Sequence, residues 1–86
     1  MPYSIRIKES AAKELARLPR QERLRIISAI DSLSENPLAG SVLKGGLRGL
    51  RRLRIGNYRV LYEVLDDQLV VLVARVAHRR EAYRNS

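Results

Sequence analysis

Residues 50–65 read LRRLRIGNYRVLYEVL, and this stretch decides the fold. Apolar and polar residues alternate on both sides of Gly56-Asn57, a dipeptide typical of a two-residue turn between antiparallel strands. We therefore expect strands over residues 50–55 and 58–65. The turn sets the register and predicts four directly opposed pairs: Ile55 with Tyr58, Arg54 with Arg59, Leu53 with Val60, and Arg52 with Leu61.

This register gathers three arginines on one side of the hairpin. Arg54 opposes Arg59, and Arg52 is two residues from Arg54, so the three side chains share one face. Directly opposed like charges destabilise a hairpin, by roughly 0.2–1 kcal/mol for such a pair. Arginines concentrated in this way indicate a site for a phosphate whose developing negative charge they stabilise. The alternative is an exposed face on which the arginines splay apart in water.

The rest of the chain predicts a single α+β domain over residues 1–86. The other expected elements are a strand over residues 2–8, helices over 9–18 and 20–35, a glycine-containing connection over 37–49 and a mostly apolar strand over 69–76. Ser10 is the expected N-cap of the first helix, and Pro19 separates the two helices. The fold class is thus α+β: an N-terminal strand, a two-helix antiparallel hairpin, a three-stranded antiparallel sheet, and a short C-terminal helix or tail.

Charge points to a polyanionic partner. The formal net charge is +8. Residues 1–43 contain seven basic and five acidic side chains, whereas residues 44–86 contain ten and four. Most of the basic residues are arginines, which suit bidentate phosphate contacts. Nucleic acid, an acidic protein, or both in turn would fit, and a basic surface kept for solubility is the alternative.

Composition excludes several other classes. The chain has no cysteine and one histidine, which rules out disulfides and thiolate metal sites and makes a structural zinc site implausible. We expect no metal and no cofactor. The longest apolar run, residues 69–74, is too short to cross a bilayer, and the N-terminus lacks the apolar core of a signal peptide. We therefore expect a cytoplasmic protein without a membrane partner.

Several motifs together resemble the RelE toxins of bacterial toxin–antitoxin pairs. They are an AxKxLxxLP helix end at residues 11–19, an Asn-Pro helix stop at 36–37, a Leu-Lys-Gly step at 43–45, the pattern RLRxGxYRxxYE at 52–63, and HRxxxY at 78–83. They extend over nearly the whole chain, and the last two are specific for the RelE/ParE superfamily. The resemblance implies a compact sheet with two helices on one side. It also implies metal-independent cleavage of messenger RNA in the A site of the 70S ribosome, by attack of a ribose 2′-hydroxyl that leaves a cyclic phosphate.

The resemblance also assigns roles to individual residues. Arg52 and Arg54 match basic catalytic positions, and Arg59 matches the arginine that stabilises the transition state. The C-terminal motif supplies a second phosphate-binding arginine, Arg79, and a tyrosine that positions the base or assists the chemistry, Tyr83. The remaining candidates for RNA or ribosome contacts are basic residues: Lys44, Arg48, Arg51 and Arg80.

Two departures from the family pattern concern the proton transfers and the start of the hairpin. The family's best-understood member has lysines where this chain has Arg52 and Arg54, and arginine is a poor general base because it does not readily lose its proton. The base would then be His78 or Tyr83, or the rate would come from charge stabilisation and orientation. Arg51 stands where many relatives have an aromatic residue, so a stacking or packing contact would be missing.

Other functions fit the same sequence. A ParE-like toxin shares the fold, inhibits DNA gyrase and cleaves no RNA. A plain nucleic-acid-binding module would bind phosphate in a salt-dependent way without cleaving it. Either kind of toxin implies a cognate antitoxin, which we expect to be an acidic, RelB-like protein that wraps the domain with an amphipathic helix and neutralises the arginines.

Overall fold

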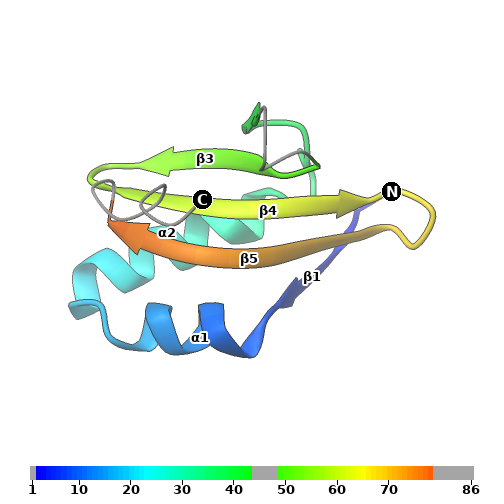
Figure 1. The fold of residues 1–86 in the computed structure, drawn as a ribbon. Helices are drawn as coiled ribbons and strands as arrows, with labels where there is room; N and C mark the ends of the chain where they lie inside the picture. Colours follow the sequence, from blue (N-terminus) through cyan, green and yellow to red (C-terminus); the bar gives the residue numbers. More distant parts are fainter. Residues whose placement is uncertain (1, 44–48, 79–86) are drawn as a thin grey trace.

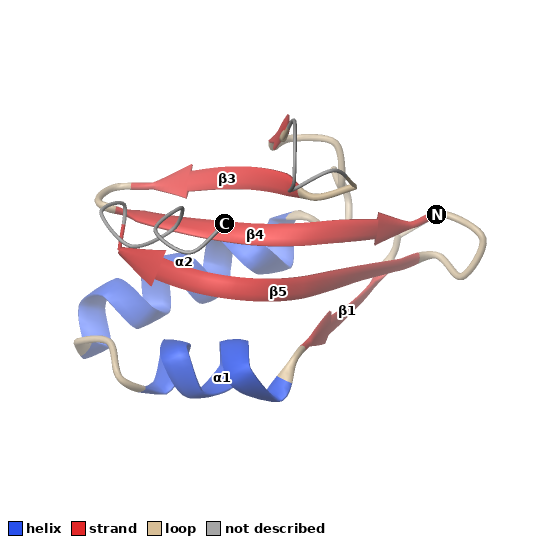
Figure 2. Cartoon of the chain, in the orientation of Figure 1, coloured by secondary structure: helices blue, strands red, loops and turns tan. Residues whose placement is uncertain are grey.

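The computed structural model describes residues 2–43 and 49–78. Its elements in chain order are β1 Ser4–Ile7, α1 Glu9–Ala16, α2 Arg20–Ser32, β2 Ser41–Val42, β3 Arg51–Ile55, β4 Tyr58–Leu65 and β5 Val70–His78. The described strands form one five-stranded sheet in the order β1-β5-β4-β3-β2. Both helices lie on one side of it (Figure 1), so helices and strands form two layers (Figure 2).

The α+β class is confirmed, but the sheet is larger than the expected three-stranded antiparallel one. β1 lies beside β5 and runs parallel to it, with Ser4 paired to Val70 and Ile7 to Val73. The short strand β2, inside the expected 37–49 connection, pairs with β3. Neither pairing has a local signal, because β1 meets β5 only after both helices have intervened and two residues are too few to show a period.

The helices end earlier than expected, and the N-cap of the first one is a different residue. Lys8, not Ser10, is the N-cap of α1, and no side chain caps the helix. The Lys8 N–H donates to Val73 O and closes the β1–β5 ladder, while the Lys8 carbonyl accepts from Ala12 N–H in the helix. The chain thus passes directly from strand to helix, with no room for a capping residue at Ser10. Neither helix of the described ranges is long and apolar enough to span a bilayer.

The core lies between the helices and the near face of the sheet. Its buried cluster contains Ala11, Leu15, Ile26, Ile30, Leu33, Val60, Tyr62, Val71, Val73 and Val76. Since β4 and β5 contribute alternate residues to this cluster, their other side chains point to the sheet face opposite α1 and α2. The hairpin register agrees with all four predicted pairs, and Gly56 at its turn has a φ of 57°, where glycine is favoured.

A bulge in β5 changes which of its side chains face the helices. Leu61 pairs with Arg75, but the next residue, Tyr62, pairs with Val73, so Ala74 is an extra residue. A regular strand would point Arg75 toward the helices together with Val73. The bulge instead buries Val73 and Val76 in the core and turns Arg75 outward.

Candidate nucleic-acid interface

The predicted arginine cluster forms on the side of the sheet away from the helices. Arg54 on β3 is directly opposite Arg59 on β4, and Arg52 shares their face. Arg54 is exposed, whereas Arg52 and Arg59 are half-buried. The Nε of Arg59 is itself buried, so the base of its guanidinium is enclosed while the residue stays partly exposed. The structure therefore brings together three of the predicted site residues.

A fourth arginine joins them from β5. Arg75 is directly opposite Leu61, which is directly opposite Arg52, so the three form one row across β5, β4 and β3. Arg59 pairs with Ala77, two residues along from Arg75. Arg75 is therefore a diagonal neighbour of Arg59, at a Cα separation of about 7–8 Å. We call the side of β3, β4 and β5 opposite α1 and α2, with the four arginines Arg52, Arg54, Arg59 and Arg75, the arginine face.

Leu61 lies at the centre of the arginine face. It is 2% exposed, although it is not a member of the core cluster between sheet and helices. Its neighbours across the strands are Arg52 and Arg75, whose long alkyl stems are suited to lie along an apolar side chain while the charged ends stay accessible. The arginines of the face thus lie on three strands with an apolar residue, Leu61, between Arg52 and Arg75.

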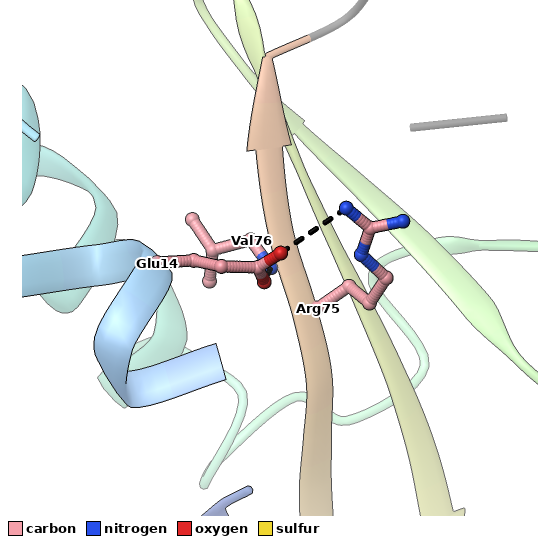
Figure 3. A network of polar contacts seen from close by, with 3 residues as sticks. All are labelled: Glu14, Arg75 and Val76. Carbon is pink, nitrogen blue, oxygen red and sulfur yellow. Dashed lines mark hydrogen bonds and ion pairs between the residues drawn. The ribbon is translucent and has the colours of Figure 1, made fainter. Parts of the chain in front are cut away.

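Arg75 is held by helix α1. Its Nη2 donates to Glu14 Oε2 over 3.1 Å, and the other oxygen, Oε1, accepts the Val76 backbone N–H over 2.8 Å. Figure 3 shows Glu14 reaching from α1 to the edge of β5 and meeting the guanidinium there. This edge of β5 is beyond the β1 ladder, which ends at Val73, so the carboxylate replaces a neighbouring strand.

Arg51 faces the other way. It is directly opposite Tyr62, on the helix side, and its Nη1 donates to Gly40 O over 2.7 Å. The Tyr62 hydroxyl accepts from Gly40 N–H at 2.9 Å and donates to Pro37 O at 2.7 Å. A Cβ on Gly40 would lie 2.6 Å from Arg52 O, so only glycine fits there. Arg51 thus stabilises the loop before β2 through this hydrogen bond and is not part of the arginine face.

His78 is also on the helix side. It is directly opposite Tyr58, and the two rings meet edge to face with centroids 5.5 Å apart. They line a hollow of about 230 Å³ between the end of α1 and the end of β5, and Arg75, which meets Glu14 at the edge of β5, lines it as well. The sheet therefore separates His78 from Arg54 and Arg59, and the structure does not bring it together with them.

The other predicted residues, Lys44, Arg48, Arg79, Arg80 and Tyr83, lie outside the described residues, as does the expected C-terminal helix or tail. Within the described ranges, no group of three His, Cys, Asp or Glu side chains is placed to hold a metal ion. Sequence reasoning missed Arg75, because the apolar run over 69–76 favours a strand covered on both faces. The sequence does show one arginine, Arg75, within that apolar run, but the face to which its side chain points depends on the bulge.

Comparison with known proteins gives a consistent result. Residues 5–83 match the family model described as ParE toxin of type II toxin–antitoxin system, parDE. Toxin RelG of Mycobacterium tuberculosis is 36% identical over 98% of this chain and 99% of its own length. Toxin RelE of the same organism is 34% identical over 96% of this chain and 88% of its own. The toxin–antitoxin complex RelBE2 from M. tuberculosis contains a chain with a TM-score of 0.85 and 34% identity, covering 92% of this chain and all of that one.

Proposed function

Since the chain belongs to the family of type II toxin–antitoxin toxins that includes RelE and ParE, we propose that it is a ribosome-dependent endoribonuclease that cleaves messenger RNA in the A site and so inhibits translation. The observation that carries this proposal is the opposed pair Arg54 and Arg59, with Arg52 on the same face. Such a pair weakens the hairpin on its own, and a bound phosphate would compensate both charges.

The chemistry that suits this face is transfer within the RNA strand. The ribose 2′-hydroxyl attacks the adjacent phosphorus and the bond to the 5′-oxygen breaks, leaving a cyclic phosphate and a free 5′-hydroxyl. Negative charge grows on the phosphate oxygens during this step, and fixed guanidinium groups stabilise it without reorganisation. The buried Nε of Arg59 supports a central place for this residue, because a positive charge partly removed from water interacts more strongly with a phosphate than a fully exposed one.

Arg52, Arg54 and Arg59 serve as donors in this proposal, not as bases, because guanidinium groups stay protonated. Alignment of the attacking hydroxyl comes from the ribosome, which holds the message in line with the leaving oxygen. We leave His78 out of the reacting set, since it faces Tyr58 on the helix side. Arg79 and Tyr83 keep the roles that the family resemblance implies.

We also propose an acidic, RelB-like antitoxin that covers the arginine face. A relative of this chain is known in a toxin–antitoxin complex, and the net charge of +8 favours an acidic partner. The affinity of the pair should fall steeply with salt, and Arg54→Gln should make that dependence shallower. A complex in which the arginine face stays open to solvent while cleavage is abolished would contradict this mode of inhibition.

The function is tested by primer-extension mapping of a defined message in a translating bacterial extract. We expect new 5′ ends inside codons that depend on active ribosomes. Arg59→Ala should lower cleavage by about 100-fold or more, the usual loss when one transition-state donor is removed. Arg20→Ala, an exposed arginine at the start of α2, is the matched control and should cleave like the wild type. Intact message at protein levels that still arrest growth would refute the proposal and favour inhibition of DNA gyrase.

A further inference from the structure

We propose that Arg75 is an additional phosphate-binding residue on the arginine face and that Glu14 positions it. This inference rests on the proposed function only for its ligand class, which is single-stranded RNA. Arg75 would hold the phosphate next to the one that Arg59 engages, so that two consecutive phosphates of the strand lie across β4 and β5. None of the family motifs includes this residue, and its direction depends on the bulge at Ala74.

The first step is the direction of the side chain. The extra residue Ala74 turns Arg75 out of the core, and the next outward position, directly opposite Arg59, is the small residue Ala77. Arg52 on β3 and Arg75 on β5 are both diagonal neighbours of Arg59, one on each side of β4, at about 7–8 Å. An anionic strand bound at Arg59 can therefore reach Arg52 if it continues toward β3 and Arg75 if it continues toward β5.

The second step is how Arg75 is held. Glu14 is fixed by the Val76 N–H through one oxygen and uses the other to accept from Arg75. The carboxylate is thus attached to the backbone of β5 next to the residue that it binds. Arginine carries five N–H donors, and this hydrogen bond with Glu14 engages one nitrogen. Figure 3 shows the one contact with Glu14, and the side chain of Arg75 remains 40% exposed, which leaves donors available for a phosphate.

A purely structural ion pair between α1 and β5 is the competing explanation, and RNA binding distinguishes the two. The measurement is the affinity of the whole protein for a 2′-O-methyl oligoribonucleotide, which lacks the attacking hydroxyl, over a range of salt concentrations without ribosomes. For single strands, the slope of log K against log salt becomes shallower by about 0.7 for each phosphate that the protein no longer neutralises. We expect this decrease for Arg75→Gln and none for Arg20→Gln, which removes the same charge from the helix side.

Two outcomes would overturn the assignment of Arg75. They are an Arg75→Gln slope equal to that of Arg20→Gln, or no binding of the oligonucleotide by the wild type at low salt. Because the probe is not cleaved, the result does not depend on the primer-extension experiment. The two proposals can therefore fail separately. If the wild type cleaves no message but Arg75→Gln has the shallower salt slope, the nuclease function is refuted and the phosphate-binding role of Arg75 stands.

Glu14→Gln tests the positioning role. The amide keeps an oxygen for the Val76 N–H, so the strand edge stays paired, but the charge that orients Arg75 is removed. Removing a negative charge should by itself strengthen RNA binding. If Glu14 positions Arg75, binding should instead weaken, while Arg75→Gln and the double variant bind alike. Stronger binding by Glu14→Gln would overturn the positioning role.

Discussion

Arg54 on β3 and Arg59 on β4 lie directly opposite each other, with both side chains on the arginine face. Arg75 on β5 extends the same face across a third strand. The hairpin would be more stable without one of the two opposed arginines, Arg54 or Arg59, because directly opposed positive charges repel each other. The arginines that lower the stability of the hairpin are therefore also the residues best suited to bind a phosphate. Substitutions can measure the effect on stability and the effect on activity separately.

Arg54→Gln should raise stability and lower activity. Removing one member of the opposed pair relieves repulsion worth roughly 0.2–1 kcal/mol, so the free energy of unfolding in urea should increase by that amount. Cleavage of messenger RNA should decrease, because one donor to the phosphate is removed. Arg20→Gln, which removes a charge from the start of α2, should change neither quantity. Lower stability together with unchanged cleavage would contradict the interpretation of this face.

The hydroxyl of Tyr62 should contribute to stability through its two hydrogen bonds, in addition to the packing of its ring. Tyr62→Phe leaves Gly40 N–H and Pro37 C=O without the hydroxyl that joins them, and each unsatisfied buried group costs about 1–3 kcal/mol. We expect a decrease of unfolding free energy in this range by urea denaturation. Tyr58→Phe is the matched control, since Tyr58 contributes a ring contact to His78, which phenylalanine retains. Equal decreases in the two variants would show that the bridge contributes nothing.

The central hairpin could be predicted in detail because its information is local. Gly56-Asn57 fixes the turn, the turn fixes the register, and the alternation of residue types fixes the faces. The strand bounds 58–65 agree with β4, and 50–55 differs from β3 by one residue. The arginine cluster follows from these facts alone, without knowledge of the remaining chain.

The missed features depend on contacts between distant segments. The β1–β5 ladder is parallel and forms across two helices, and the start of α1 is determined by that ladder and not by Ser10. Arg75 escapes prediction for a related reason, since only the bulge at Ala74 decides its direction. The helix-side position of His78 depends on the same β4–β5 register. The turn between β4 and β5 does not specify that register, whereas Gly56-Asn57 specifies the register of β3 and β4.

The hydrogen bond from the Tyr3 hydroxyl to Asp66 Oδ1, 2.7 Å long, should make stability depend on pH in the alkaline range. This bond, together with burial and the nearby carboxylate charge, raises the pKa of Tyr3 above its ordinary value of 10.0. The folded state then holds its proton more tightly than the unfolded chain. The stabilisation is therefore complete below pH 10 and is lost as the pH rises through the folded pKa.

Tyr3→Phe removes this titration. In urea melts, the advantage of the wild type over Tyr3→Phe should be constant between about pH 7 and 9 and should shrink above pH 10. Asp66→Asn keeps an oxygen acceptor but removes the charge, so its alkaline decrease in stability should be smaller than that of the wild type. An advantage that grows above pH 10 would show that the sign of the linkage is wrong.

The position of His78 gives the last prediction, which separates the two faces of the sheet. General acid or base groups contribute roughly 10²–10⁴-fold to a rate, so His78→Gln would lose activity on that scale if the imidazole transferred a proton in the reaction. Because His78 lies with Tyr58 on the helix side, we expect a loss of less than about tenfold, well below the effect of Arg59→Ala. The measurement is the initial rate of message cleavage in the translating extract at matched protein concentrations. A loss for His78→Gln as large as that for Arg59→Ala would mean that the ring reaches the reacting phosphate, and it would return His78 to the catalytic set.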